Sequence, residues 1–515
     1  MLEICAFALR GYEGSLVTVE TDLRRGLPGA EIIGLPDSAV KESKERVRAA
    51  IKNSLLNFPN ERLLINLTPA GMKKEGAAFD LAIALAVLHV SKQIKSDAEN
   101  FSGKIMILGE LELSGRVRSV PGVLSAMASA QDAGISSFII PVENQAEAQA
   151  VGAGNYWPVS SLKEAVSALE EFLHNQKPRH IAPAYEISKP KRDFDVDMKD
   201  IKGQPFMKRA LEVAAAGRHH LFFFGPPGCG KTLCSRAMPS ILPDLEIEES
   251  LETSRIYSIK GNLESELITT PPFRQPHHSA SPEGIIGGGK TVMPGEISLA
   301  HHGVLFLDEA PEFGKEVLQN LREPLESHRV TLARAGQNVW YPADFQLLMT
   351  ANVCPCGSMG RNDKVCLCSQ QEIGRYWKRI GGAVMDRIDI RLPAKPVGPE
   401  ILLSDEEESS ESVRMRVTEA ADRQKRRFKD LPFRRNAMIP ASHIKEFCGL
   451  TEEAEKAFMM AINRLSLSMR AGHSILRLAR TIADLDNSDT IEAKHTLEAT
   501  SYRRYGDNDL FWTEI

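Results

Sequence analysis

The chain has 515 residues, of which 43% are hydrophobic and 25% are charged, and its formal net charge at pH 7 is −5. This is the composition of a globular protein with apolar residues for several cores, and a prior of roughly 150 residues per domain predicts three or four domains. The weak negative charge excludes a uniformly basic nucleic-acid coat, but it does not exclude a basic groove on a near-neutral body.

Two features of the sequence predict a cytoplasmic protein. No long apolar run is present, so we expect no membrane span, and the opening MLEICAFALRGYEG, with Glu3 and no extended apolar stretch, is a poor signal peptide. Eight cysteines are too few for a disulfide scaffold, and four of them lie in one short segment, which is typical of metal binding in a reducing compartment.

Residues 1–175 alternate short apolar runs with amphipathic stretches, which predicts an α/β domain. Strands are expected at Leu63–Pro69, Lys104–Gly115 and Phe138–Pro141 because each is a short aliphatic run next to turn residues. Ala77–Val90 is apolar around the whole helical period and predicts a buried helix.

The rest of the chain divides into four segments. Residues 176–196 are polar and contain several Pro and Lys, which predicts a linker, and residues 197–396 repeat apolar strand, glycine turn and helix, as in a parallel α/β sheet. Residues 397–505 have a helical pattern, in which the acidic stretch Ser404–Arg414 is a loop or an exposed helix start. Residues 506–515 form a tail.

The sharpest signal is LFFFGPPGCGKT (Leu221–Thr232), an apolar run that ends in a complete G-x-x-x-x-G-K-[ST] motif. The glycines let backbone N–H groups turn toward phosphate oxygens, and the helix that follows adds its partial positive charge. We expect Lys231 to contact the β- and γ-phosphates of ATP and the Thr232 hydroxyl to bind Mg²⁺. The predicted nucleotide-binding residues of this loop are Gly225, Pro226, Pro227, Gly228, Cys229, Gly230, Lys231 and Thr232.

Two later strands supply the rest of the predicted site. HHGVLFLDEAPEF (His301–Phe313) is an apolar strand that ends in Asp308, a candidate Mg²⁺ ligand, and Glu309, a candidate residue for polarising the attacking water. DFQLLMTAN (Asp344–Asn352) ends in Asn352, whose amide can contact the γ-phosphate and the water, the role called sensor 1. A lone Asp-Glu pair is usually a solvated strand end, but its distance from the loop and the apolar run before it favour catalysis.

The segment CPCGSMGRNDKVCLCS concentrates four cysteines within 15 residues and predicts one tetrahedral Zn²⁺ site with a structural role; the alternative is four free thiols. The predicted ligands are Cys354, Cys356, Cys366 and Cys368. The other four cysteines, Cys5, Cys229, Cys234 and Cys448, are scattered and are expected to be small buried side chains.

Three arginines are candidates for nucleotide sensing. Arg387 lies just before a predicted strand and is a candidate arginine finger that reaches a neighbouring subunit's nucleotide. Arg477 and Arg480 lie on a mostly apolar predicted helix, where either is a sensor 2 arginine or a surface residue with a buried stem.

In this order the motifs resemble those of AAA+ ATPases. RQPHHSASPEGIIGGGKTVMPGEISLAHHGVLFLDE (Arg274–Glu309) and LREPLESHRVTLARAG (Leu321–Gly336) are similar to the Mg-chelatase-like branch, and within it to the ComM/YifB family. Members are described as hexameric DNA helicases that drive branch migration during natural transformation. The resemblance implies that Arg387 is the finger and Arg477 is sensor 2, although VMDR stands here where LLDR is more usual.

The N-terminal block resembles the proteolytic domain of Lon in Gly109–Asn144 and Lys73–Leu88. Lon-like proteases use a Ser–Lys dyad, and the matching positions here are Ala78 and Leu124. Because neither side chain is a nucleophile or a base, the resemblance implies a Lon/S5-like α/β fold without peptide hydrolysis.

The family resemblance further implies two pore hairpins, a helix-2 insert at Gly284–Ser298 and a hairpin before sensor 1 at His328–Pro342. Lys290 and Arg334, near the tips, are expected to pair with DNA phosphates without reading sequence; the alternative is that both segments are ordinary solvated loops.

The sequence therefore predicts an α/β protein with an AAA+ core and a helical lid, using ATP and Mg²⁺ and holding structural Zn²⁺. We expect a ring, inferred to be hexameric, that moves along branched or single-stranded DNA. The alternatives are a motor subunit of a magnesium chelatase and a non-proteolytic AAA+ regulator that remodels proteins.

Overall fold

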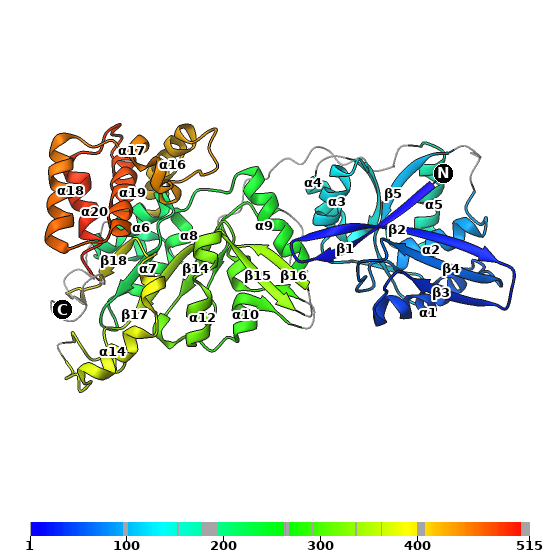
Figure 1. Ribbon diagram of the computed structural model, residues 1–515, viewed down its shortest axis with the longest axis horizontal. Coiled ribbons are helices and arrows are strands. Elements are labelled where there is room, and N and C mark those ends of the chain that lie inside the picture. The colour runs from blue at the N-terminus through cyan, green and yellow to red at the C-terminus, as the bar shows by residue number, and fades with distance from the viewer. Residues whose placement is uncertain are drawn as a thin grey trace.

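The computed structural model describes residues 2–95, 101–151, 154–176, 194–261, 263, 267–289, 292–334, 337–361, 363–398 and 407–505. Most of the predicted linker at 176–196, Lys290 and the tail at 506–515 lie outside these residues. Figure 1 shows three masses in a row, with the N-terminal sheet domain at one end, a second sheet in the centre and a group of helices at the other end.

The N-terminal domain is built on a seven-stranded mixed sheet in the order β3-β4-β2-β1-β5-β8-β9. β1 and β2 form an antiparallel hairpin, β2 and β4 are antiparallel, and the remaining neighbours are parallel. The strands are β1 (Leu2–Arg10), β2 (Glu13–Arg24), β3 (Gly29–Ile33), β4 (Arg62–Thr68), β5 (Gly103–Ile107), β8 (Ser137–Pro141) and β9 (Asn155–Val159). The helices that accompany them are α1 (Ser38–Asn53), α2 (Asp80–Val90), α3 (Val123–Asp132), α4 (Gln145–Val151) and α5 (Leu162–Leu173).

The prediction of one strand at Lys104–Gly115 is wrong beyond Ile107. Gly109 pairs with the start of α2 instead of a neighbouring strand: its N–H donates to Ala78 O (3.2 Å) and its carbonyl accepts from Leu81 N (3.0 Å). The chain therefore leaves the sheet and forms a short hairpin from β6 (Glu110–Leu111) and β7 (Val117–Arg118). The expected buried helix is α2, in which every residue from Asp80 to Leu88 is buried.

The central domain is a five-stranded sheet in the order β11-β14-β17-β10-β18, and every neighbouring pair is parallel. The strands are β11 (Phe273–Arg274), β14 (Val304–Leu307), β17 (Gln346–Ala351), β10 (Leu221–Phe224) and β18 (Ile390–Pro393). Phe223 packs with α6 (Pro205–Gly217) and the C-terminal helices, whereas Phe222 and Phe224 pack on the opposite face. Both faces are covered, which explains why β10 is a continuous apolar run.

Two hairpins leave the central domain, as the sequence predicts. The first, between α10 (Pro282–Ile286) and α11 (Glu296–Leu299), pairs β12 (Gly287–Gly288) with β13 (Met293–Pro294). The second pairs β15 (Arg329–Arg334) with β16 (Gln337–Pro342) immediately before β17. The Tyr341 hydroxyl donates to Val292 O (2.7 Å), so the base of the second hairpin lies against the turn side of the first.

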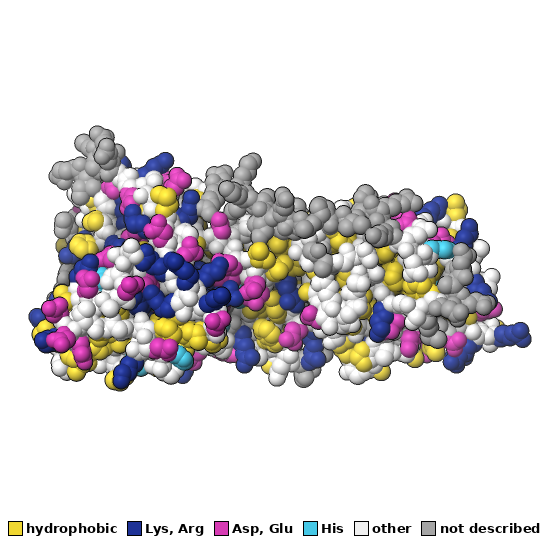
Figure 2. Space-filling model, turned by 90° about the horizontal axis from the view of Figure 1, so that it is seen from above, with side chains coloured by type: hydrophobic (Ala, Val, Ile, Leu, Met, Phe, Trp, Pro, Cys, Tyr) yellow, Lys and Arg dark blue, Asp and Glu magenta, His cyan; other side chains and the backbone are white. Residues whose placement is uncertain are grey.

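The C-terminal region is helical, as expected, with α16 (Ser410–Arg427), α17 (Ile444–Phe447), α18 (Glu452–Leu465), α19 (Met469–Leu485) and α20 (Ala493–Ser501). Figure 2 shows Lys and Arg side chains interleaved with Asp and Glu on one face at this end of the molecule. Lys425 pairs with Glu246 (2.7 Å) and Arg434 with Glu248 (2.6 Å), so the central domain neutralises two positive charges of the C-terminal region.

The N-terminal domain contacts the hairpin β15–β16 and α9 (Ile247–Lys260). Tyr12 N donates to Trp340 O (3.0 Å), and the two rings have centroids 5.5 Å apart. Gly122 N donates to Ser258 O (3.1 Å), and the Ser258 hydroxyl donates to the buried carboxylate of Glu147. Among the described residues no helix is long and apolar enough to cross a membrane.

Candidate nucleotide site

The predicted site residues follow three neighbouring strands at the same edge of the central sheet. The loop Gly225–Thr232 follows β10 and leads into α7 (Lys231–Arg236), Asp308 follows β14, and Asn352 follows β17. Because these strands are parallel, their carboxyl ends meet at one edge, which is where ligands bind in open α/β sheets.

Backbone geometry requires glycine at three positions of the loop. Gly228 (φ 84°) and Gly230 (φ 77°) are in the left-handed region, which an L side chain adopts only with strain. A Cβ on Gly225 would lie 2.3 Å from Ala394 O, because this residue crosses directly beside the end of β18. The loop conformation therefore depends on glycine at these three positions.

Lys231 is 7% exposed, and its ammonium group lies inside the loop. Nζ donates to Gly225 O (2.8 Å) and Pro226 O (2.8 Å) and lies 3.3 Å from Asn352 Oδ1. Burial lowers the pKa of Lys231, and nearby acidic groups oppose this shift. The structure thus brings together a buried cation, the glycine-rich loop and the predicted sensor amide.

Asp308 and Thr232 lie side by side, as the sequence predicts. The Thr232 hydroxyl donates to both oxygens of Asp308, at 3.2 and 3.1 Å. An exposed hydroxyl and a half-buried carboxylate offer only oxygen ligands, which is the donor set that Mg²⁺ prefers. These residues fit the predicted Mg²⁺ site.

Glu309 is exposed beside this pair, with a backbone φ of +53°. Its N–H donates to the Thr350 hydroxyl (3.0 Å), and that hydroxyl donates to Asp308 Oδ1 (2.5 Å). Sequence reasoning missed Thr350. The signal was available, because Thr350 is a polar residue within the apolar run that leads to Asn352, only two residues before it.

Arg387 is not presented at the surface as a finger is expected to be. Its side chain is 6% exposed, and the guanidinium pairs with Glu326 and donates to Ala383 O. Glu326 lies on α13 (Pro324–Ser327), which follows α12 (Lys315–Asn320), and Ala383 lies on α15 (Gly382–Met385). Burial and the neighbouring charges of Arg470 and Arg322 lower the pKa of Arg387. To reach a second subunit, this side chain must exchange Glu326 for the new partner.

The structure separates the two candidate sensor 2 arginines. Arg480 is 1% exposed and binds Asp484 Oδ1 (3.0 Å) and Asp489 O (2.7 Å), so it stabilises the lid. Arg477 is half-buried, and its Nε has no hydrogen-bond partner among the described residues. It makes no hydrogen bond to the Gly225–Thr232 loop there either, so its predicted role is not visible in this conformation.

The four clustered cysteines converge between β17 and α14 (Gln370–Lys378). Their Sγ atoms lie within 4.8 Å of one another, and the pairs among Cys354, Cys356 and Cys366 are 3.4–3.6 Å apart. Zn–S bonds of about 2.3 Å in a tetrahedron require sulfurs about 3.8 Å apart, close to this spacing. The thiols therefore fit the predicted Zn²⁺.

The cysteine loop also touches the nucleotide loop. Met359 N donates to Cys354 Sγ (3.3 Å) and Ser358 N donates to Cys356 Sγ (3.4 Å), so backbone N–H groups support two of the four sulfurs. A Cβ built on Gly357 would lie 3.1 Å from Pro227 Cγ, which shows how closely the two loops pack. The other four cysteines are buried, as expected.

The predicted DNA contacts are only partly placed. Arg334 is the last residue of β15, paired with Gln337, but its side chain lies outside the described atoms. Lys290 is also outside the described residues. The structure supplies the two hairpins but not the geometry of their tips.

Two other features of the molecule have the residues or the volume of a ligand site. His301, His302 and Glu252 form a second cluster of potential ligands. His301 Nδ1 accepts from Asp344 N (3.0 Å), so the neutral ring carries its proton on Nε2, which faces Glu252 Oε2 (3.3 Å). A protonated Nε2 offers no lone pair to a metal, so this cluster is a hydrogen-bonded anchor.

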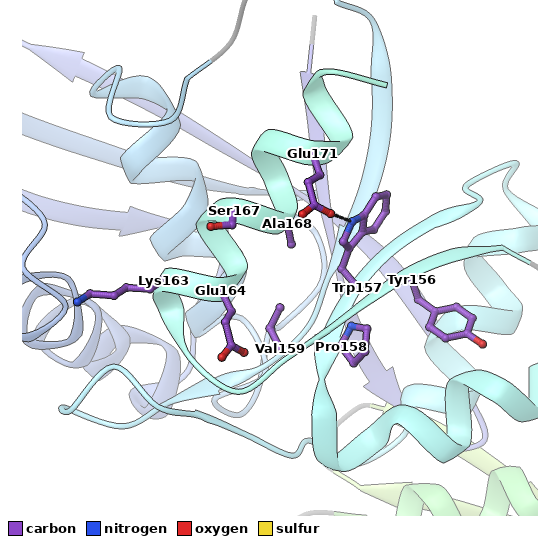
Figure 3. A pocket seen from close by; sticks show the side chains of 9 residues that line it. All are labelled: Tyr156, Trp157, Pro158, Val159, Lys163, Glu164, Ser167, Ala168 and Glu171. Carbon is purple, nitrogen blue, oxygen red and sulfur yellow. Dashed lines mark hydrogen bonds between the residues drawn. The ribbon is translucent and has the colours of Figure 1, made fainter. Parts of the chain in front are cut away.

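A cavity of about 480 Å³ lies beside β9 and α5 in the N-terminal domain (Figure 3). Trp157 Nε1 donates to Glu171 (2.9 Å), and Glu164 accepts from Ser160 N (2.7 Å). In Figure 3 Lys163 points away from the other lining side chains. A cavity lined by two carboxylates does not suit a phosphate group.

Comparison with known proteins agrees with this architecture. Three family models match: "Magnesium chelatase, subunit ChlI" over residues 197–401, "Subunit ChlI of Mg-chelatase" over 19–144, and "Magnesium chelatase, subunit ChlI C-terminal" over 407–503. The chain is 40% identical over 502 residues to the uncharacterized protein YifB of Escherichia coli, covering 96% of each chain. It is 39% identical over 505 residues to competence protein ComM of Haemophilus influenzae, again covering 96% of each.

The chain belongs to the ComM/YifB family of Mg-chelatase-like AAA+ proteins. A Lon protease of Mycolicibacterium smegmatis is 26% identical over 180 residues, which is 32% of this chain and 22% of that protein. The α/β fold class with an AAA+ core and a helical C-terminal region, predicted from the motifs, is confirmed.

Proposed function

We propose that this protein is an ATP-hydrolysing AAA+ motor that acts on DNA, with branch migration or strand remodelling in recombination as its task. The observation that carries the proposal is the joint geometry of Lys231, Thr232 and Asp308 at the carboxyl edge of the parallel sheet. The DNA substrate is supported by the 39% identity to a protein named for competence, over nearly the whole length of both chains.

Each residue of the site has a chemical role in this proposal. Lys231 exchanges its carbonyl partners for the β- and γ-phosphates, and Thr232 and Asp308 hold Mg²⁺. Glu309, which is exposed, orients and polarises the attacking water, and Asn352 contacts the γ-phosphate. Mg²⁺ neutralises charge on the phosphates when it is bound.

The proposed assembly is a ring, hexameric by family resemblance, with each nucleotide at a subunit seam. Arg387 leaves Glu326 and binds the γ-phosphate held by its neighbour, while Arg477 on α19 senses the nucleotide within its own subunit. Removal of an arginine finger costs about 10³–10⁵ in rate, which is large enough to test this arrangement. In this proposal the AAA+ core spans residues 197–396 and the helical lid spans residues 397–505.

The hairpins and the cysteine cluster serve the motor. Lys290 and Arg334 contact phosphates in the pore without sequence specificity, so binding should weaken as salt rises. A structural Zn²⁺ on the four cysteines stiffens the loop that packs on Pro227. The N-terminal domain is not a protease in this proposal, because Ala78 and Leu124 supply neither a nucleophile nor a base.

The deciding experiment is ATP-driven migration of a synthetic four-way junction by the purified full-length chain. We expect migration by the wild type and none by Glu309→Gln, which should still bind ATP. An ATPase that ignores DNA but responds to porphyrin with partner subunits would instead identify a chelatase motor. A chain that binds no DNA and remodels a protein would identify the regulator.

The shared nucleotide site is tested by mixing two inactive variants. Arg387→Ala keeps an intact phosphate loop, and Lys231→Ala keeps an intact Arg387, so mixed rings contain some seams with both. We expect partial recovery of ATP hydrolysis on mixing. Absence of recovery, with mixed rings shown by cross-linking, contradicts the arrangement across subunits.

A further inference from the structure

A single hydroxyl connects both acidic residues of the nucleotide site. Thr350 is 1% exposed on β17, which lies between β14 and β10. Its Oγ1 donates to Asp308 Oδ1 (2.5 Å) and accepts from Glu309 N (3.0 Å). A hydroxyl has one donor and two acceptor lone pairs, so these two bonds use its donor and one lone pair and fix its rotation.

The direction of the two bonds matters. The Glu309 N–H polarises the hydroxyl, which makes it a better donor to the negatively charged Asp308. Glu309 at the same time has a φ of +53°, a left-handed conformation that is strained for a non-glycine residue. The bond to Thr350 is a direct contact that holds this backbone conformation.

The other polar group of the site lies just past the strand that carries Thr350. Asn352 is two residues after Thr350 and directly follows the end of β17. Thr350 contacts Asp308 and Glu309 after β14, and Asn352 lies 3.3 Å from Lys231 after β10. The carboxyl end of β17 thus presents one polar group toward each of its two neighbouring strands.

We propose that Thr350 is a positioning residue for ATP hydrolysis, which aligns Asp308 with the metal and Glu309 with the attacking water through one hydroxyl. This inference rests on the proposed ATPase function and deepens it. Thr350 does not touch nucleotide; it acts through the two carboxylates. The predicted consequence is an effect on turnover and on Mg²⁺ activation, with little effect on ATP affinity at saturating Mg²⁺.

The test uses the full-length protein and the isosteric change Thr350→Val, with Thr350→Ser as the variant that keeps the hydroxyl. Loss of a residue that orients a metal ligand typically costs 10–100-fold in metal affinity or activity. We expect Thr350→Val to lower kcat and to raise the half-activating Mg²⁺ concentration, each by about 10-fold or more, while KM for ATP changes by less than about threefold. Thr350→Ser should remain close to wild type.

The matched control is Thr253→Val, which removes another fully buried threonine hydroxyl from the same domain, bonded to His301 O (3.4 Å). If Thr350 only packs, the two variants will lose thermal stability without a change in Mg²⁺ activation, and that result overturns the proposal. If Thr350→Val does not fold, Thr350→Ala is measured in the same way and decides the question.

A double variant separates the effect of Thr350 that acts through Glu309 from the effect that acts through Asp308. If Thr350 acts on the water through Glu309, then Thr350→Val should slow Glu309→Gln by a smaller factor than it slows the wild type, because only the effect through Asp308 remains and the two substitutions are not additive. Full additivity overturns that half of the proposal. Mg²⁺-dependent retention of ATP by Glu309→Gln, with and without Thr350→Val, tests the Asp308 half without requiring hydrolysis. An inactive wild type would refute the ATPase function, yet this last measurement would still report on Thr350.

Discussion

The two sheet domains each bury a lysine among their described residues, and the two lysines differ in their place in the fold. Lys74 of the N-terminal domain is fully buried, and its Nζ donates to Gly34 O (2.8 Å) and to Pro69 O. Lys231 also donates to two backbone carbonyls, but those belong to a glycine-rich loop at the carboxyl edge of a parallel sheet. The same hydrogen bonds to carbonyl groups thus hold a structural anchor in one domain and, in the other, the lysine that we propose binds phosphate.

The N-terminal domain contacts the central domain through a buried leucine and a buried carboxylate. By the resemblance to Lon-like proteases, Leu124 stands where those proteins carry a lysine. Leu124 is buried in a cluster with Ala150 of its own domain and Leu267 of the central domain. Its N–H donates to Glu147 (3.1 Å), whose carboxylate also accepts from Ser258 on α9. Burial raises the pKa of Glu147, and its hydrogen bonds oppose this shift. An apolar residue at position 124 therefore serves the contact between domains.

The largest difference between the two lysines should appear in nucleotide binding. Lys231→Ala should abolish ATP binding, a loss of at least about 100-fold, because a charged hydrogen bond to phosphate is removed. Lys74→Met should leave binding unchanged but lower the stability of the N-terminal domain, since each buried carbonyl left without a donor costs about 1–3 kcal/mol. Fluorescent-nucleotide titration and thermal unfolding measure both, and loss of nucleotide binding in Lys74→Met would remove the contrast.

The next effect compares two carboxylates: Glu309, which is exposed in the central domain, and Glu147, which is buried in the N-terminal domain. Glu309→Gln should lower kcat by about 10²–10⁴ and retain ATP, because a general base contributes a factor of that size. Glu147→Gln, in the interface between the domains, should change kcat by less than about threefold. Steady-state hydrolysis with a filter assay for bound ATP gives both values. Equal losses would show that the interface, and not the chemistry, limits turnover.

Metal removal should affect the central domain alone. We expect about one Zn²⁺ per chain, lost in Cys366→Ser and retained in Cys5→Ala, because Cys5 is a solitary buried thiol of the N-terminal domain. Loss of zinc should lower the unfolding temperature of the central domain and weaken ATP binding through the contact of Gly357 with Pro227. Elemental analysis combined with thermal unfolding tests this, and protein without stoichiometric metal would refute the zinc site.

Acid should destabilise the central domain more than the N-terminal one. Burial lowers the pKa of His220 and His301 to about 4 from 6.5, so unfolding takes up protons at both positions. The stability that they contribute is fully present above pH 6.5 and is lost as the pH falls toward 4, at most about 2 kcal/mol for each histidine by pH 5.

In the N-terminal domain burial lowers the pKa of His89, which gives a smaller effect of the same sign. Urea unfolding at pH 7 and pH 5, followed in variants that retain Trp157 or Trp377, compares the domains. Equal losses of stability at the two tryptophans would contradict the expected difference.

Sequence patterns found side chains that converge in the structure where each pattern is local. The phosphate loop, the strand ending in Asp308 and the four cysteines are each read within a short segment, and the structure brings their side chains together. The sequence prediction failed at Lys104–Gly115, where an apolar run was taken as one strand, because the bonds of Gly109 to α2 are not local. The sequence also made Arg477 and Arg480 equal candidates for sensor 2, and only the hydrogen bonds of Arg480 to Asp484 and Asp489 distinguish them.

By itself, the sequence determined which chemical groups are present: a glycine-rich loop with a lysine, two acidic residues after a strand, an amide after a later strand and a thiol cluster, all recognised by their spacing along the chain. The tertiary structure alone decided which groups act together. Thr350 and Asp308 are 42 residues apart, and Arg387 meets Glu326 from another helix. Such contacts depend on strand order and helix packing, which local residue patterns do not encode.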